Sequence, residues 1–333
     1  MIPLITRRRG AAAPALAALG VAVTVVAGCS SGSTQLGGAS SPSVWAPMPA
    51  GVTEIRSLPG TASDTGCGDP TASYRPTGAQ TGGTLAMIRA RGRLIAGVDQ
   101  NTYKFGYRNP VTGRLEGFDV DIARAVAKAI FGNPDAIQFR VVDPGTRIAA
   151  VQDHDVDITV DTMTVNCARW KDVAFSTVYY QAGQRVLVPK SSTATSIASL
   201  GGKKVCAAAG STSIQNIVNA AGTGGSKPIG IQVSDWTDCL VMLQQNQVDA
   251  ISTDDTILAG LAAQDPSTKI VGPAMTSEPY GIAIAKDRID LVRFVNGVLA
   301  QMRTDGEWQT IYHRWLAGLL GDTGTPPTPR YRD

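Results

Sequence analysis

Histidine is scarce in this chain of 333 residues: only His154 and His313 are present, far apart in the sequence. The five cysteines include no CxxC pair, the spacing that many zinc sites use. A metal site needs three or four His, Cys or carboxylate ligands close together. The sequence therefore predicts no metal site.

The glycine fingerprint of dinucleotide-binding enzymes, GxGxxG, is also missing, although the chain has 36 glycines. A single Rossmann-type enzyme would need that motif after its first strand to bind the pyrophosphate. Without this motif and without a metal site, we expect no cofactor.

Long apolar runs are few, and one lies near the start, where residues 11–27 are almost all Ala, Val and Leu after three arginines at positions 7–9. This run is too short to cross a bilayer comfortably and fits a secretory signal. It ends in "VAGC" (26–29), which resembles the lipobox of bacterial lipoproteins. That resemblance implies removal of residues 1–28 and a lipid on Cys29. An ordinary secretory signal followed by a structural cysteine is the alternative.

Net charge is small as well. The chain has 30 basic and 27 acidic residues, and residues 1–28 contain three of the arginines and no acid. Removing them leaves 30 − 3 = 27 basic residues against 27 acidic ones. Nucleic-acid binding needs a basic surface, so we expect no nucleic-acid partner.

The composition indicates a folded centre between irregular ends. Residues 30–80 are rich in Ser, Gly, Thr, Pro and Ala, which is typical of a flexible tether. Periodic, core-forming sequence follows and is long enough for two small domains. The expected parts are a signal peptide (1–28), a lipidated tether and N-terminal extension (29–82), a first lobe (83–183 and 277–320), a second lobe (184–276) and a flexible tail (321–333).

Four cysteines remain after the lipidation site, and an even number outside the membrane is typical of disulfides. Three pairings are possible. We favour Cys206–Cys239, because Cys206 falls in a predicted strand and Cys239 in a nearby predicted helix. The other pair, Cys67–Cys167, would then pin the end of the tether to the first lobe.

Strands and helices alternate through the centre of the chain. "RLIAGVD" (93–99) has the pattern of a buried strand, and residues 118–130 carry apolar side chains at helical spacing before Gly132. The alternation then repeats in a second half. Linking strands at 184–190 and 278–287 would cross between the halves. The pattern predicts an α/β protein of two lobes with a hinge and a ligand between them.

Five motifs of this region resemble, in order, those of bacterial solute-binding proteins for polar amino acids, the receptors of ABC importers. They are "GRLEGFDVDIARAVAKAI" (113–130), "VDITVDTMTVNCARWKDVAFSTVYY" (156–180), "GKKVCAAAGSTS" (202–213), "VDAISTDD" (248–255) and "YGIAIAKD" (280–287). Within the family, the chain most resembles glutamine- and glutamate-binding lipoproteins. The resemblance implies a periplasmic-binding-protein-like fold, with two α/β lobes joined by two hinge strands, and no enzymatic activity.

The resemblance also implies which residues hold the zwitterion of a free amino acid. Its carboxylate suits a guanidinium, and its ammonium suits a carboxylate. Arg169 matches the residue that binds the α-carboxylate, with Thr164 beside it. Asp254 matches the residue that binds the α-ammonium. Asp255 competes for that role, although an acid there could instead cap the following helix.

Further positions of the site follow from the same motifs. Thr212 matches a turn position whose backbone N–H donates to the carboxylate, with Ser211 next to it. Thr162 stands where the family usually has glycine and would offer its carbonyl.

The side-chain pocket is assigned by the same resemblance. Phe118 matches an aromatic wall, and Asp99 matches an acid that accepts from a side-chain amide. Tyr103 would line the mouth, in competition with Asn101 and Thr102. Core packing is the alternative for both Phe118 and Tyr103.

The preferred side chain stays open between Gln, Asn, Glu and Asp. Asp99 would repel an acidic side chain, whereas Lys104 or Arg108 would attract one. The lysine that glutamine binders often carry in the second lobe is Ala208 here.

The predicted function is a lipid-anchored receptor on the extracytoplasmic face of the cell membrane. It would capture a polar L-amino acid by closure of its lobes and deliver it to a membrane permease. An amino-acid sensor for a membrane signalling partner is the alternative. An enzyme would need a cleft carboxyl group as general acid, and Asp254 and Asp99 already have ligand-binding roles. We expect a monomer.

Overall fold

The computed structural model describes residues 47–58, 66–77 and 83–333. All of them belong to the unit Ala46–Asp333. The predicted signal peptide and the lipidation site Cys29 therefore lie outside the described residues. No helix in the described part of the chain is long and apolar enough to cross a membrane.

Lobe 1 is built on a five-stranded mixed sheet in the order β7-β3-β8-β17-β9. β3 runs parallel to β7 and β8, because helices connect these strands and return the chain to the same edge. β17 runs antiparallel to β8 and β9. The strands are β3 (Leu94–Val98), β7 (Ile137–Val141), β8 (Ile158–Thr159), β9 (Ala174–Phe175) and β17 (Ala283–Ile284).

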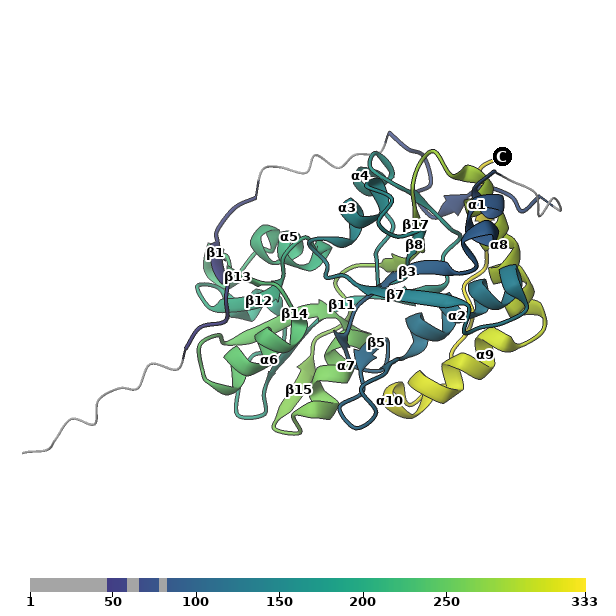
Figure 1. Ribbon diagram of the computed structural model, residues 1–333. Coiled ribbons are helices and arrows are strands. Elements are labelled where there is room, and N and C mark those ends of the chain that lie inside the picture. The colour runs from purple at the N-terminus through teal and green to yellow at the C-terminus, as the bar shows by residue number, and fades with distance from the viewer. Residues whose placement is uncertain (1–46, 59–65, 78–82) are drawn as a thin grey trace, which may run out of the picture. The chain divides into compact units, whose positions relative to one another are not determined.

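Helices and a small antiparallel sheet complete lobe 1, and Figure 1 shows α2 and α8 beside its strands. The helices are α1 (Gly83–Arg91), α2 (Phe118–Phe131), α3 (Arg147–Gln152), α4 (Cys167–Trp170), α8 (Ile289–Thr304), α9 (Glu307–Tyr312), a π-helical turn (His313–Ala317) and α10 (Gly318–Leu320). The small sheet is made of β4 (Asn101–Thr102), β5 (Gly106–Arg108) and β6 (Leu115–Glu116).

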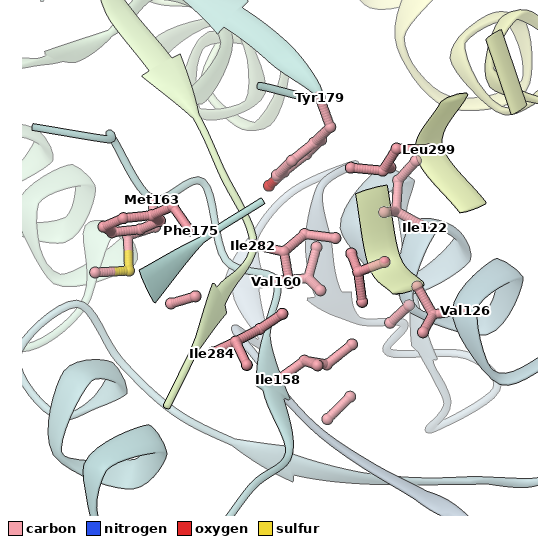
Figure 2. Close-up of a cluster of buried hydrophobic side chains, with 14 of the residues drawn as sticks. Ile122, Val126, Ile158, Val160, Met163, Phe175, Tyr179, Ile282, Ile284 and Leu299 are labelled. Atoms are coloured by element: carbon pink, nitrogen blue, oxygen red, sulfur yellow. The ribbon is translucent and has the colours of Figure 1, made fainter. Parts of the chain in front are cut away.

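The core of lobe 1 forms where α2 packs on the sheet. Ile122 and Val126 lie one turn apart on the buried face of α2, and Figure 2 shows them in one cluster with Val160 and Ile282. The helix ends at Gly132, whose φ of 71° is left-handed and whose N–H donates to the Lys128 carbonyl. The helical period of the sequence therefore places one apolar face against the strands.

Lobe 2 has a six-stranded sheet in the order β1-β13-β12-β14-β11-β15 and a hydrophobic core of its own. The strands are β1 (Thr53–Ile55), β11 (Gln184–Pro189), β12 (Lys204–Ala208), β13 (Ile229–Val233), β14 (Ala250–Asp254) and β15 (Thr268–Val271). Its helices are α5 (Thr212–Asn219), α6 (Trp236–Gln244) and α7 (Asp255–Gln264), with 3-10 turns at Ile197–Leu200 and Thr223–Gly225. Two separate cores make two lobes.

Two strands pair with each other between the lobes. β10 (Tyr180–Ala182) leads from lobe 1 into lobe 2, and β16 (Glu278–Tyr280) leads back. They run antiparallel, with Tyr180 opposite Tyr280 and Ala182 opposite Glu278. The fold is thus two α/β lobes joined by two hinge strands.

The N-terminal extension contacts both lobes. β1 pairs antiparallel with β13 at the edge of the lobe 2 sheet. Further along, β2 (Ala72–Ser73) lies on lobe 1, where the Ser73 hydroxyl donates to the Phe175 carbonyl (2.5 Å). The expectation of a flexible tether over residues 30–80 is therefore wrong for residues 53–55 and 72–73, which form strands.

The C-terminal residues also return to lobe 1, although their composition pointed to a flexible tail. β18 (Arg330–Tyr331) pairs in parallel with β2. Arg330 forms an ion pair with Asp69 (3.0 Å), and the Arg332 guanidinium lies 4.0 Å from the centre of the Trp170 ring. These partners are distant in sequence, so composition alone could not indicate them.

Two disulfides are present, with the pairing that the sequence favoured. Cys206 of β12 is bonded to Cys239 of α6, and Cys67 is bonded to Cys167 at the start of α4. The first links a strand to a helix within lobe 2. The second ties the N-terminal extension to lobe 1.

Candidate ligand-binding site

Arg169 lies where the two lobes meet. It belongs to α4, whose N-cap Asn166 accepts a hydrogen bond from the Arg169 N–H (2.9 Å). Its side chain is buried, and Nη1 donates to the Thr164 carbonyl (2.6 Å) while Nη2 donates to the Gly210 carbonyl of lobe 2 (3.1 Å). Burial, and to a lesser extent the charge of Arg147, lower the pKa of the guanidinium to about 9. The cation is thus fixed by both lobes.

Gly210 allows this close approach of the lobes. Its φ is +71°, and a Cβ built there would lie 2.6 Å from the Pro144 carbonyl oxygen of lobe 1. A larger residue would therefore be strained and would also push the lobes apart.

Asp254 comes from lobe 2, at the end of β14 and directly before α7. It is the N-cap residue of α7, but its side chain makes no capping bond. Oδ2 accepts from the Tyr280 hydroxyl (2.5 Å), whereas Oδ1 is buried without a hydrogen-bond partner. Burial raises the pKa of Asp254 to about 8, and the nearby charge of Glu278 adds to this rise.

Asp255, the competitor for the same role, is occupied locally. Its Oδ1 accepts from the Thr256 N–H (2.9 Å) and from the Gly183 N–H (3.3 Å). The neighbouring acids therefore have different partners: Asp255 holds the start of α7 and the hinge, and Asp254 keeps one free acceptor.

Glu278 also lies at the junction, the region where the two lobes meet around Arg169 and Asp254. The sequence analysis missed this residue. It lies in β16 and is only 3% exposed. Its Oε2 accepts from Thr164 Oγ1 of lobe 1 (2.6 Å) and from Thr212 Oγ1 of lobe 2 (3.0 Å). Its Oε1 accepts from Thr276 Oγ1 (2.6 Å). One buried carboxylate thus brings together the two threonines that the family motifs singled out.

Ser211 and Thr162, the other two predicted residues with hydroxyl groups, form bonds in different parts of the fold. Ser211 is the N-cap of α5, where its Oγ donates to the Ala208 carbonyl (2.6 Å) and accepts from the Ile214 N–H (3.3 Å). Thr162 has a φ of 37°, in the left-handed region that glycine adopts most readily. Its N–H donates to Asp119 Oδ2 (2.8 Å).

The predicted pocket residues are spread over lobe 1. Asp99 is buried, and its Oδ1 accepts from the N–H groups of Gln100 (2.6 Å) and Asn101 (3.0 Å), while Oδ2 accepts from Thr102. Burial raises its pKa to about 6. Tyr103 lies close to Gly260 of α7 in lobe 2. A Cβ placed on Gly260 would be 3.0 Å from the Tyr103 carbonyl oxygen.

Phe118 is fully buried in a cluster of aromatic rings. Its ring packs edge-on against Phe105, Tyr180 and Trp308, with centroids 5.7 to 5.8 Å apart. This is the placement of a core side chain, which was the alternative interpretation.

Four more charged residues of lobe 1 are buried, and the sequence analysis did not single them out. They are Asp119, Arg147, Asp157 and Asp161. Burial raises the pKa of Asp119 to about 7 and that of Asp161 well above its ordinary value. Asp161 lies two residues after the buried strand β8, and an acid just beyond the carboxyl end of a buried strand is a signal that could have found it.

The junction therefore suits binding of a small, charged molecule. It offers a cation from lobe 1, a carboxyl group from lobe 2 and hydroxyl groups between them. Among the residues that the structure describes, no three His, Cys, Asp or Glu side chains are placed to hold a metal ion.

Known proteins resemble this chain in sequence. Residues 94–318 match the family described as bacterial extracellular solute-binding proteins, family 3. The ABC transporter glutamine-binding protein GlnH of Bacillus subtilis is 40% identical over 234 residues, which cover 70% of this chain and 84% of that protein. The glutamine-binding protein of Geobacillus stearothermophilus is 37% identical over 235 residues, covering 70% and 88%.

Solved structures match as well. An ancestral arginine-binding protein bound to glutamine is 34% identical, with a TM-score of 0.63 over 68% of this chain and 98% of that one. A mutant of the arginine-binding protein ArgBP of T. maritima is 27% identical, with a TM-score of 0.65 over 70% and 99%. The two-lobed fold, the junction and the match over residues 94–318 agree, and the chain belongs to the bacterial extracellular solute-binding proteins of family 3.

Proposed function

We propose that the chain is the lipid-anchored substrate-binding protein of an ABC importer, which captures a polar L-amino acid and passes it to a membrane permease. Glutamine is the proposed ligand of choice, with Asn, Glu and Asp as the other candidates. Two relatives named as glutamine-binding proteins support this choice. The lipid anchor rests on the sequence pattern that ends at Cys29.

A buried guanidinium and a buried carboxyl group on opposite lobes carry the proposal. The Arg169 guanidinium donates to two carbonyl oxygens, and no carboxylate among the described residues forms an ion pair with it. Asp254 has one buried carboxylate oxygen without a partner. The carboxylate of an α-amino acid would satisfy the first, and its ammonium would satisfy the second.

The remaining contacts are proposed around these two. Thr164 and Thr212 lie within hydrogen-bond distance of one Glu278 oxygen, so both can reach the same bound group. We retain Thr162, Ser211, Asp99 and Tyr103 as residues that surround the ligand. Phe118 supports the site from the core instead.

The substitution Arg169→Ala tests the site. It would leave a buried ligand carboxylate without its partner, so affinity should fall by about 100-fold or more. Isothermal titration calorimetry with glutamine measures this loss. Arg303→Ala is the matched control, because Arg303 also belongs to lobe 1 and also donates to backbone carbonyls, those of Val178 and Pro327.

Two outcomes decide the proposal. Normal glutamine binding by the Arg169→Ala variant would show that the ligand binds elsewhere. Failure of all twenty amino acids to raise the melting temperature of the unmodified chain would reject amino-acid binding altogether. Uptake of labelled glutamine in a deletion strain then separates import from sensing.

A further inference from the structure

Arg147 and Asp161 form a buried pair whose hydrogen-bonding capacity is largely unused. Both side chains are at most 3% exposed, and Nη1 of Arg147 lies 3.5 Å from Oδ2 of Asp161. The Nη1 group donates to the Asp161 main-chain carbonyl rather than to its carboxylate. Both carboxylate oxygens of Asp161 and the Nε of Arg147 have no hydrogen-bond partner. Buried polar atoms rarely lack a hydrogen-bond partner, because each unsatisfied atom costs about 1 to 3 kcal/mol of stability.

The pair belongs to the same junction as the proposed zwitterion site. Arg147 begins α3, and Asp161 begins the loop that carries Thr162 and Thr164 and leads to Arg169. The charge of Arg147 lowers the pKa of Arg169 in lobe 1 and of Asp254 in lobe 2. The charge of Asp161 raises the pKa of Arg169. The pair is thus within electrostatic reach of both residues that would hold the α-groups.

The neighbouring buried acids are already engaged within lobe 1. Asp99 accepts from two backbone N–H groups and a threonine hydroxyl. Asp119 accepts from the Thr162 N–H and from the Tyr179 hydroxyl (2.9 Å). Of these three acids, Asp161 alone has both oxygens without a hydrogen bond. It is therefore the acid best able to accept hydrogen bonds from a ligand.

We infer that Arg147 and Asp161 read the side chain of the bound amino acid and select a neutral carboxamide. A guanidinium next to a carboxylate offers donors and acceptors side by side, and a carboxamide presents a carbonyl acceptor next to an NH₂ donor. The charge of Arg147 favours the ionised form of Asp161, so the side-chain carboxylate of glutamate would meet Arg147 but would be repelled by Asp161. The cationic side chain of arginine would meet Asp161 but would be repelled by Arg147. This inference rests on the proposed function, because it requires an amino acid held by Arg169 and Asp254.

The substitution Asp161→Asn tests whether the charge of Asp161 repels the side chain of glutamate. Calorimetry on the whole chain would give dissociation constants for glutamine, glutamate and arginine. The unmodified chain should prefer glutamine to glutamate by about 10-fold or more. In the Asp161→Asn variant this ratio should fall by about 10-fold or more, mainly through tighter glutamate binding, because the repelling charge is gone.

Asp157→Asn is the matched control. Asp157 lies directly before β8 and Asp161 two residues after it, and both are buried. Asp157 instead pairs with Arg288 (3.1 Å) and accepts from the Ile95 N–H (2.8 Å). This variant should lose stability while keeping the preference of the unmodified chain for glutamine over glutamate.

The variant Arg147→Met gives a second readout should Asp161→Asn fail to fold. Glutamine should bind about 10-fold or more weakly, and arginine should bind more tightly, because Asp161 is then unpaired. The inference would be overturned if the preference of Asp161→Asn for glutamine over glutamate stayed within about twofold of that of the unmodified chain. The pair would then have only a structural role. So would an unmodified chain that prefers glutamate or arginine. Complete absence of amino-acid binding would instead reject the proposed function.

Discussion

Asp254 is a carboxyl group that should carry a proton until the ligand arrives. Its pKa of about 8 results mainly from burial and then from Glu278, while the hydrogen bond from Tyr280 acts in the opposite direction. Asp255 raises this pKa and Arg147 lowers it. An ammonium placed beside the carboxylate favours its ionised form, so binding must release the proton.

This mechanism predicts a pH dependence. Affinity for glutamine should rise by up to about tenfold per pH unit between pH 6 and 8 and then level off. Calorimetry at pH 7 in two buffers of different ionisation enthalpy should show release of close to one proton. The Asp254→Asn variant should bind weakly and release none. Binding without proton release in the unmodified chain would contradict the role of Asp254.

The same kind of buried carboxyl group determines whether the ligand-free protein gains or loses stability as the pH rises. Burial raises the pKa of Asp99 to about 6, of Asp119 to about 7 and of Asp254 to about 8. The folded state therefore holds more protons than the unfolded state above the ordinary pKa of aspartate. Their contribution to stability is full below that pKa and is lost as pH rises towards 8.

At the scale of elements, the disulfide between β12 and α6 holds lobe 2 together. Cys206 and Cys239 are fully buried and 33 residues apart in sequence. Closing a loop of that length stabilises the folded state by about 3 to 4 kcal/mol in the chain-entropy description. The bond also fixes α6 against the strand that precedes the Gly210 turn.

Replacing both residues by alanine should lower the free energy of unfolding by about 2 to 4 kcal/mol. Urea denaturation followed by circular dichroism measures this change. The double variant Cys67→Ala and Cys167→Ala is the comparison, because that bond ties the N-terminal extension rather than lobe 2. A loss below about 1 kcal/mol in the Cys206 and Cys239 variant would mean that packing alone holds α6.

At the scale of the whole molecule, β10 and β16 form the hinge between the lobes. Hydrogen bonds at the junction hold the two lobes together. Arg169 donates across it to Gly210, and Glu278 accepts from a threonine of each lobe. These bonds describe lobes that are in contact. Opening would rotate one lobe about the two strands and break the bonds that cross the junction.

Closure by ligand should be visible in solution. Adding glutamine should reduce the radius of gyration measured by small-angle X-ray scattering, because a ligand that contacts both lobes favours the closed form. The Arg169→Ala variant should show no such decrease at the same glutamine concentration. An unchanged radius in the unmodified chain at saturating glutamine would argue against capture by closure.

The N-terminal extension adds a third covalent path between the lobes. β1 lies in the lobe 2 sheet, and Cys67 is bonded to Cys167 in lobe 1. Eight residue steps separate Leu58 from Gly66, and an extended chain spans at most about 3.6 Å per step, or about 29 Å. No open form can separate these two residues further.

The sequence alone determined the elements and the charged residues that face the proposed α-groups. Helical and strand periods predicted the two α/β lobes, because a repeated apolar spacing indicates its own secondary structure. Arg169 and Asp254 could be named because each belongs to a continuous motif. The pairing of Cys206 with Cys239 followed from two neighbouring elements.

Only the tertiary structure decided which charges are buried and what they face. Glu278 meets Thr164 across 114 residues of sequence, and Arg147 meets Asp161 only because α3 returns to the end of β8. The C-terminal residues meet the N-terminal extension on lobe 1 through partners as far apart in sequence as Asp69 and Arg330. The physical reason is that desolvation and hydrogen-bond satisfaction depend on neighbours in space, whereas periodicity and motifs depend on neighbours along the chain.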